Sequence, residues 1–270
     1  MRPGTKALPL VIFSDLDGTL LDHVSYDFEP ARPMLERLAR TGAALIVATS
    51  KTAAEVASIR SALGFAHCPA IVENGAGILE PGHRAATDGA ARDELRQKVA
   101  ALPDGLGQRF TGFADWGPAE IARRTGLDPA AAARAAERQF TEPGVFTGTA
   151  AELEAFLEQL RAVGISAQRG GRFLTLSFGA DKAARLAEVA RRYRLPGVVP
   201  RTIALGDGEN DIAMIEAADI GIVVPNPAHP PLPVLGGEAV GRVIRAPAPG
   251  PRGWRLALEE VLAAIPGAGD

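Results

Sequence analysis

Two aspartates that are two residues apart follow an apolar run near the start of the chain. Residues 11–13 (VIF) lead through Ser14 into Asp15 and Asp17. Such a run is typical of a strand buried on both faces in a parallel sheet, and both acids then project the same way just past its end. Two carboxylates this close repel each other unless a cation or a shared proton relieves them. The pattern indicates metal-assisted acid chemistry, with an ordinary Asp-Gly turn as the alternative.

Polar side chains also follow three later apolar runs, at residues 43–48, 69–72 and 202–205. These side chains and their neighbours are Thr49, Ser50, Lys51, Glu73, Asn74, Gly75, Asp207, Asn210 and Asp211. Because the carboxyl ends of parallel strands meet at one edge of a sheet, we expect these groups to converge with the first two acids. Oxygen ligands suit Mg²⁺, without which the carboxylates could not accept an anionic phosphate. The combination predicts a phosphoryl-transfer site, although Thr49 alone could cap a helix and Asp207 and Asp211 could simply favour a helix start.

A lysine at the start of a later helix completes the predicted site. The chain has four lysines against 25 arginines, so each lysine marks a place where a compact, movable charge is preferred. Lys182 opens the predicted helix 181–195, which places it over the same sheet edge. There it would neutralise phosphoryl oxygens. The alternative is a solvated lysine at a helix end.

The elements that must position these groups alternate between helix and strand. Helical spacing at 30–41 and 52–63 separates the first three apolar runs, and predicted helices at 181–195 and 212–218 flank the fourth, with a fifth strand at 220–224. This order predicts an α/β fold with a doubly wound parallel sheet, a Rossmann-like core. Residues 225–233 (PNPAHPPLP) read as a surface loop, followed by a Pro/Gly-rich stretch to 251 and a late helix at 254–265.

The composition changes in the middle of the chain, where apolar runs become rarer. Helices are expected at 93–102, 118–124, 129–140 and 152–163, and an alternating strand at 173–178. We interpret residues 83–179 as an inserted α+β domain and residues 1–82 with 180–270 as the core. The alternative is one continuous domain with long excursions.

The composition of the chain limits the partners and the cellular compartment to be expected. The 270 residues carry a net charge of −3, which gives no reason to expect a nucleic-acid partner. Cys68 is the sole cysteine, so no disulfide within the chain is possible and a reducing compartment, the cytoplasm, is expected. No signal peptide and no membrane span are expected either. The oligomeric state is left open.

The sequence resembles the haloacid dehalogenase superfamily of phosphotransferases in four motifs. These are DLDGT at 15–19, the hydroxyl of Thr49, Lys182, and GDGEND at 206–211. The insertion resembles the large cap of the Cof-type branch. Within that branch five segments are similar to the mannosyl-3-phosphoglycerate phosphatase family: 21–33, 48–52 (ATSKT), 71–78 (IVENGAGI), 137–143 (ERQFTEP) and 170–176 (GGRFLTL). Thr175 departs from an expected histidine and Ala183 from a usual glycine.

This resemblance implies a Mg²⁺-dependent phosphatase that releases mannosylglycerate, a compatible solute, from 2-O-mannosyl-3-phosphoglycerate. Asp15 would be the nucleophile and Asp17 the general acid and base, while Thr49 and Lys182 bind phosphoryl oxygens. The ion would be held by Asp15, the Asp17 carbonyl and Asp207, with Asp211 and Asn210 orienting its waters. The substrate candidates are Ser50, Lys51, Glu73, Asn74, Gly75, Arg138, Thr141, Glu142, Arg169, Arg172 and Thr175.

Other activities remain open at this stage. Within enzymes, the alternatives are a phosphatase for glucosyl-3-phosphoglycerate, for sucrose phosphate, or for a broad set of sugar phosphates. A signalling receiver domain also clusters acids, a hydroxyl and a lysine, but the long insertion and the second acid of the first motif argue against it. A catalytically silent phosphate-binding protein is the third possibility.

Overall fold

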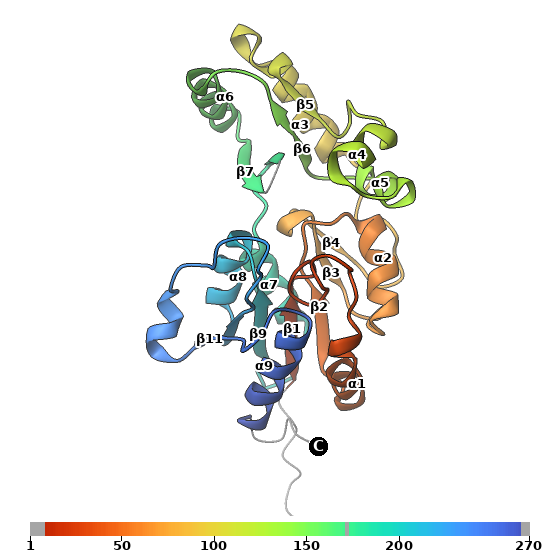
Figure 1. Ribbon diagram of the computed structural model, residues 1–270, viewed down its shortest axis with the longest axis vertical. Coiled ribbons are helices and arrows are strands. Elements are labelled where there is room, and N and C mark those ends of the chain that lie inside the picture. The colour runs from red at the N-terminus through yellow and green to blue at the C-terminus, as the bar shows by residue number, and fades with distance from the viewer. Residues whose placement is uncertain (1–8, 171–172, 266–270) are drawn as a thin grey trace, which may run out of the picture.

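The structure, a computed structural model, describes residues 9–170 and 173–265. The chain folds into two parts, a core built on a parallel sheet and a cap built on an antiparallel sheet (Figure 1). Among the residues that the structure describes, no helix is both long enough and apolar enough to cross a bilayer.

The core sheet has five strands in the order β11-β10-β9-β1-β2, and every neighbouring pair is parallel. The strands are β1 (Leu10–Ser14), β2 (Ala44–Val47), β9 (Arg201–Gly206), β10 (Ile220–Val223) and β11 (Val243–Arg245). Strand β2 is buried throughout, and β1, β9 and β10 are buried after a partly exposed first residue, which agrees with their mostly apolar sequences. The edge strand β11 is buried only at Val243. The predicted parallel α/β fold is confirmed.

The order of the strands reverses between β1 and β9. From β1 the chain moves outward to β2, whereas from β9 it moves the opposite way to β10 and β11. Right-handed crossovers therefore place α1 (Arg32–Thr41) and α8 (Ile212–Ala217) on opposite faces of the sheet. This reversal leaves a crevice beyond the carboxyl ends of β1 and β9, where open α/β sheets bind their ligands.

Three other helices complete the core: α2 (Ala53–Ala62), α7 (Lys182–Arg192) and α9 (Arg252–Ala263). Helix α9 packs against α1, and α7 packs against α8. The main apolar cluster runs from β1 and β2 to the buried face of α9 around Trp254. Both the late helix, predicted at 254–265, and the helix after the insertion, predicted at 181–195, are present, and α7 ends three residues earlier than predicted.

The third predicted strand, at 69–72, is present, but its main partner is not the parallel sheet. β3 (Ala70–Val72) forms an antiparallel hairpin with β4 (Gly77–Leu79), and it joins the parallel sheet only through a bridge between Ala48 and Ile71. It stays beside β2 because the Thr49 amide donates to the Ile71 carbonyl and the Asn74 amide donates to the Thr49 carbonyl. The turn after β3 therefore still reaches the edge where β2 ends.

The cap has an antiparallel sheet of four strands in the order β5-β6-β8-β7. These are β5 (Phe110–Gly112), β6 (Glu142–Phe146), β7 (Ser166–Gly170) and β8 (Phe173–Ser177), of which only β8 was predicted. The helices of this part are α3 (Ala90–Ala100), α4 (Pro118–Thr125), α5 (Pro129–Ala136) and α6 (Ala150–Ala162). An α+β cap is thus confirmed in kind, and its exact limits at 83 and 179 remain a prediction.

Helix α5 is four residues shorter than the predicted helix 129–140. It ends at Ala136, and Glu137 has left the helical conformation with a ψ of 47°. The residues that follow, 138–141, have no regular structure, bend at positions 139 and 140, and contact the core. Their backbone amides find partners there, as described below, which outweighs the helical pattern of the sequence.

The register of the cap sheet places two of the substrate candidates, Arg169 and Thr175, on opposite sides of the sheet. Thr175 lies opposite Gln168, whereas Arg169 lies opposite Leu174. Facing pairs share one side of a sheet and successive residues alternate, so Arg169 projects from the opposite side to Thr175. The side with Leu174 packs in the apolar cluster of α3 and α6. Arg172, another substrate candidate, lies outside the described residues.

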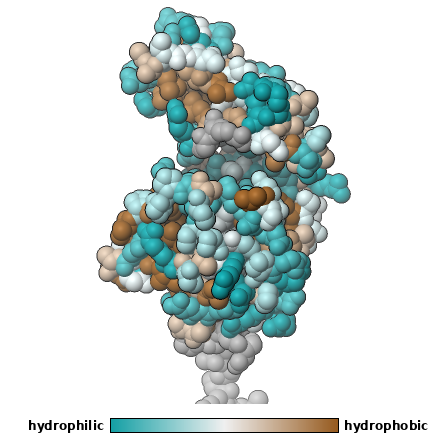
Figure 2. Space-filling view, in the orientation of Figure 1, coloured by the Kyte–Doolittle hydropathy of each residue, from teal (hydrophilic) through white to brown (hydrophobic). Residues whose placement is uncertain are grey.

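The space-filling view shows a recess between the cap and the core (Figure 2). The surface on this face is largely hydrophilic, and its apolar residues form separate spots rather than one continuous band.

Candidate active site

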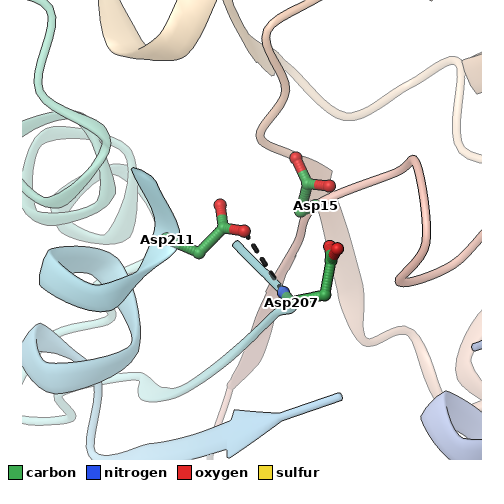
Figure 3. Close-up of side chains that lie close together, drawn as sticks. All are labelled: Asp15, Asp207 and Asp211. Atoms are coloured by element: carbon green, nitrogen blue, oxygen red, sulfur yellow. Dashed lines mark hydrogen bonds between the residues drawn. The ribbon is translucent and has the colours of Figure 1, made fainter. Parts of the chain in front are cut away.

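Three buried carboxylates lie together at the crevice between β1 and β9. Asp15 follows β1, Asp207 follows β9, and Asp211 stands at the start of α8. Their side chains point into the same gap (Figure 3), and each contributes an oxygen within 4.8 Å of the others. The Asp207 amide donates to Asp211 Oδ2 at 3.2 Å, which ties the turn after β9 to the helix that follows. The predicted convergence of Asp15, Asp207 and Asp211 is therefore present.

Lys182 is the positive charge inside this cluster. Its Nζ lies 2.9 Å from Asp15 Oδ1 and 2.6 Å from Asp211 Oδ1, and the side chain is 1% exposed. Lys182 lies at the site because the first residue of α7 packs closely against Gly75. A Cβ at this glycine would lie only 2.5 Å from the Lys182 backbone nitrogen. Gly75 also has a φ of +95°, so two independent constraints favour glycine there.

The charged groups near Asp15 have opposing effects on the pKa of its carboxyl group. Burial raises the pKa of the Asp15 carboxyl well above its usual value, and the charge of Lys182 opposes that rise. The neighbouring acids Asp211, Asp207 and Asp17 raise it further. Because three of the four neighbouring charges repel an ionised Asp15, a divalent cation at this position would favour the charged form that a nucleophile needs.

Asp17 points toward Lys51 and does not join the carboxylate cluster. Lys51 Nζ lies 2.8 Å from Asp17 Oδ2 and 5.0 Å from the centre of the Tyr26 ring. Burial lowers the pKa of Lys51, but the charges of Asp17 and Glu55 outweigh this and raise it. Asp17 Oδ1 is buried and has no hydrogen-bond partner in the part of the chain that the structure describes. Lys51, predicted to contact substrate, here holds the second acid of the first motif.

Thr49 and the turn after β3 form one rim of the crevice. Thr49 is 1% exposed, and its hydroxyl accepts a 3.3 Å hydrogen bond from the Lys51 amide. Asn74, with a φ of +60°, accepts a 3.1 Å hydrogen bond from the Asn210 side chain, so the turn after β3 meets the turn after β9. The sequence placed these groups together, and the structure brings them together. Their contact with substrate remains a prediction.

Glu73 has a position that the sequence did not indicate. Its carboxylate is fully buried and accepts hydrogen bonds from the amides of Gln139, Phe140 and Thr141 at 2.8, 3.2 and 2.9 Å and from the Thr141 hydroxyl at 2.6 Å. These hydrogen bonds join the core to residues 139–141 after α5. The contacts of Glu73 and Thr141 are therefore with each other and do not favour their predicted contact with substrate.

Arg138 also joins the two parts. Its guanidinium donates to the Thr141 hydroxyl at 2.8 Å and to the Ser50 carbonyl at 3.2 Å, and lies 3.8 Å from Glu73. The side chain is 10% exposed, and its Nε has no partner among the described residues. Arg138 thus lies beside the loop after β2.

The predicted substrate residue Glu142 is likewise occupied within the cap. Its carboxylate lies 2.6 Å from Arg92 Nε and accepts the Ala114 amide at 2.8 Å. On strand β6 it faces Leu176, which belongs to the apolar cluster with α3 and α6. These contacts tie strand β6 to α3 and the turn after β5, and do not favour a contact with substrate.

Two residues of the Pro-rich loop 225–233 belong to the site, although the sequence assigned that loop no role. Asn226 Nδ2 donates to Asp207 Oδ2 at 2.8 Å, and His229 Nε2 lies 3.0 Å from the same oxygen. Thr19 of the first motif donates to Asp207 Oδ1 at 2.6 Å. The close packing of Asn226 also explains Gly18, where a Cβ would lie 2.2 Å from the Asn226 nitrogen.

A buried hydrogen-bond chain supports the strand end that carries the first acid. The indole of Trp254, in α9, donates to Ser14 Oγ at 3.0 Å. Ser14 Oγ in turn donates to the Asp15 carbonyl at 2.7 Å. Trp254 and Ser14 are both fully buried, so this link holds the backbone before the crevice in one conformation.

The donor set fits a Mg²⁺ ion. Mg²⁺ prefers carboxylate oxygens at about 2.1 Å, so ligands on opposite sides of one ion are about 4.2 Å apart. One oxygen each of Asp15, Asp207 and Asp211 lies within 4.8 Å of the other two, and no sulfur ligand is among them. The chemistry of these ligands agrees with the predicted ion, whose identity remains a proposal.

The sequence comparison assigns the class. The model of the haloacid dehalogenase-like hydrolase family matches residues 12–103 and 142–231, which include Asp15, Thr49, Lys182 and Asp207. The chain belongs to this family of hydrolases. Residues 104–141, which hold α4, α5 and the partners of Glu73, fall outside the match.

Solved structures share the whole fold at low sequence identity. A phosphatase of the haloalkanoate enzyme superfamily from Bacteroides thetaiotaomicron is 21% identical, with a TM-score of 0.62, over 96% of this chain and 97% of that one. The sucrose-phosphatase from Synechocystis, solved with sucrose and phosphate, is 17% identical, with a TM-score of 0.59, over 94% and 97%. A protein from Thermotoga maritima is 17% identical, with a TM-score of 0.66, over 94% of this chain and 97% of that one. These likenesses show that the fold is shared over nearly the whole length of both chains.

Proposed function

We propose that this hydrolase is a Mg²⁺-dependent phosphatase whose preferred substrate is 2-O-mannosyl-3-phosphoglycerate. The observation that carries the phosphatase assignment is the buried group of Asp15, Asp207 and Asp211 around Lys182. Carboxylates beside a buried ammonium group need a cation before they can accept a phosphate, and together they then stabilise charge on its oxygens. The proposal places the reaction in the cytoplasm, in keeping with a single buried thiol, Cys68.

The proposed reaction has two steps at one phosphorus. An Asp15 oxygen attacks the phosphorus and forms an aspartyl phosphate, while the ester oxygen leaves with a proton from Asp17. Asp17 then takes a proton from water, whose oxygen attacks the phosphorus and releases phosphate and free Asp15. Thr49 and Lys182 bind the phosphoryl oxygens, and Lys51 fixes the direction of the Asp17 side chain through its 2.8 Å contact.

The ion would be held by Asp15, the Asp17 carbonyl and Asp207, while Asp211 and Asn210 orient its waters. When bound, it neutralises charge on the phosphate and on the acids. Asp211 supports this division, since its two oxygens already accept Lys182 and the backbone amides of Asp207 and Gly208.

The finer proposal concerns the leaving group, which carries a carboxylate and a sugar. A carboxylate is best recognised by a guanidinium group. Arg138 supports this, because its Nε is unpartnered and it lies against the Ser50 carbonyl. For the sugar hydroxyls we propose Thr175 together with Gln168, which shares its side of the cap sheet. Arg169 projects from the other side and becomes the weaker candidate.

The test is phosphate release across a panel of substrates. We expect kcat/KM to be highest for mannosyl-3-phosphoglycerate, compared with glucosyl-3-phosphoglycerate, 3-phosphoglycerate and sucrose 6-phosphate. A preference for the glucosyl form or for sucrose 6-phosphate would change the assigned substrate, whereas the proposed phosphatase mechanism would stand. A receiver-like or silent binding protein would turn over none of these phosphomonoesters. The Asp15→Asn variant, assayed in parallel, controls for a contaminating phosphatase.

A further inference from the structure

The Pro-rich loop after β10 reaches back to the carboxylate cluster. The Val224 amide donates to the Gly206 carbonyl, so the loop starts beside the end of β9. Prolines at 225, 227, 230, 231 and 233 fix the backbone φ angles and lower the number of conformations open to the loop. A loop restrained in this way holds its few polar side chains in defined directions.

The orientation of the Asn226 amide is set by the loop itself. Its Oδ1 accepts a 3.0 Å hydrogen bond from the Ala228 amide, so its Nδ2 must face Asp207. Asn226 is 8% exposed, which places this bond out of contact with bulk water. The Asn226 carbonyl also lies 3.5 Å from the His229 amide, and this turn brings the imidazole over the same carboxylate.

His229 is the third residue to contact the Asp207 carboxylate. Its Nε2 lies 3.0 Å from Oδ2, and its Nδ1 lies 3.3 Å from the Pro230 carbonyl. A neutral imidazole carries one N–H, and the shorter contact leads to the stronger acceptor, the carboxylate. His229 therefore donates to Asp207 from Nε2. With a side chain that is 37% exposed, it lies at the edge of the site.

The two oxygens of the Asp207 carboxylate are unequally occupied. Among the described residues, Oδ2 accepts from Asn226 and from His229, whereas Oδ1 accepts from Thr19. Each added donor leaves less of an oxygen's electron density open to a further partner, so Oδ1 is the oxygen more open to an ion. The three donors together fix the direction of the carboxylate.

We propose that His229 is a positioning residue that fixes the Asp207 carboxylate for the divalent ion from the Pro-rich loop. The proposal rests on the assignment of Asp207 as an ion ligand. Hydrogen-bond donors behind a ligating carboxylate hold its orientation, and loss of one lowers ion affinity by about 10- to 100-fold. Removal of His229 takes one of the two donors from Oδ2 and lets the carboxylate turn, so we expect the low end of this range, about tenfold.

The experiment measures ion binding directly and without substrate. Mn²⁺ is titrated into the full-length protein while free Mn²⁺ is followed by electron paramagnetic resonance, and Mg²⁺ affinity is obtained by competition. The variants are His229→Ala, His229→Gln, whose amide can donate at similar reach, and His23→Ala as a matched control. His23 is also exposed and lies 3.4 Å from Asn226 Nδ2, but it makes no hydrogen bond to Asp207 among those of the described residues.

We expect His229→Ala to weaken Mn²⁺ and Mg²⁺ binding about tenfold, His229→Gln to recover most of the affinity, and His23→Ala to stay within about twofold of wild type. The thermal midpoint of the ion-free protein should be unchanged in all three, which excludes a general loss of structure. Wild-type affinity in His229→Ala, tighter binding in that variant, or no Mn²⁺ binding by the wild type would overturn the inference. Failure of the substrate panel alone would overturn the proposed phosphatase and leave this result standing.

Discussion

Replacing Glu73 by glutamine should loosen the contact between the core and residues 139–141, which follow α5. The carboxylate accepts four hydrogen bonds, three on Oε2 and one on Oε1. A glutamine side chain has one acceptor oxygen, so its NH₂ group must face at least one donor. With the oxygen in the Oε2 position, the Gln139 amide loses its partner and meets another donor.

The size of the effect follows from these contacts. A buried donor left without a partner costs about 1–3 kcal/mol, and the three remaining bonds weaken when their acceptor loses its charge. The burial of a neutral amide in place of a carboxylate returns part of this loss. We therefore expect Glu73→Gln to lower the free energy of unfolding by about 2 kcal/mol, which corresponds to a fall of about 4–8 °C in Tm for a chain of this size.

Two measurements check this expectation. Chemical denaturation gives the change in stability, and amide hydrogen exchange shows whether residues 139–141 lose protection more than the rest of the cap. Glu80→Gln is the control, since Glu80 is 44% exposed and pairs with Arg192 at the surface, where such a pair contributes at most about 1 kcal/mol. Unchanged exchange at residues 139–141 together with wild-type stability in Glu73→Gln would refute the reasoning.

The remaining predictions concern the carboxylate cluster. Asp15→Asn should abolish phosphate release and keep the fold, because an amide cannot form the aspartyl phosphate, and turnover near wild type would exclude the covalent step. Lys182→Met should cost about 3–5 kcal/mol of stability by leaving Asp15 and Asp211 buried without their cation, against under about 1 kcal/mol for the exposed Lys98→Met. Burial raises the pKa of Asp15, so this carboxylate becomes protonated as the pH falls, which removes a buried charge that Lys182→Met leaves unpaired. The loss of unfolding free energy in Lys182→Met, measured by urea titration, should therefore shrink as the pH falls and grow as it rises. Chelation should remove activity, and added Mg²⁺ should restore it and raise Tm, whereas full activity after exhaustive metal removal would contradict the assigned ion.

The core was predictable because its strands carry their own signal. Strands buried on both faces read as apolar runs, and the polar residues after them mark the edge where ligands bind. This was enough to bring Asp15, Asp207, Asp211 and Lys182 to one site. One exception was β3, because an apolar run does not reveal whether its partner is the parallel sheet or an antiparallel hairpin. The three-residue strands β4 and β11 were not predicted, and β11 lies within the stretch that was interpreted as Pro/Gly-rich.

The cap was harder to predict because its strands are short and partly polar. Strand β6 contains Pro143 and Gly144, which are typical of turns, and β7 (SAQRG) has almost no apolar residues. Tertiary contacts decide these elements. The same holds for the end of α5, where the hydrogen bonds to Glu73 replace further helical turns.

The site residues that the sequence missed are those whose role depends on distant contacts. Asn226 and His229 lie about 20 positions after Asp207 in a loop that reads as surface. Glu73 looks like a substrate ligand in sequence because it follows a predicted strand, and Glu142 because it lies in the segment 137–143 that resembles the phosphatase family. Only the fold shows that their oxygens are already taken by backbone amides and Arg92.

The link from Trp254 to Ser14 and Asp15 makes the protein its own optical probe. The chain has two tryptophans, and they divide between the two parts: Trp116 packs with Phe113 in the cap, and Trp254 is buried in the core two hydrogen bonds from the Asp15 carbonyl. In a Trp116→Phe variant, the emission of the single remaining indole would report events at Asp15 without any attached dye. In Trp254→Phe, the remaining emission would follow the cap. Stopped-flow fluorescence on the two variants could therefore time chemistry and cap motion separately in the same reaction.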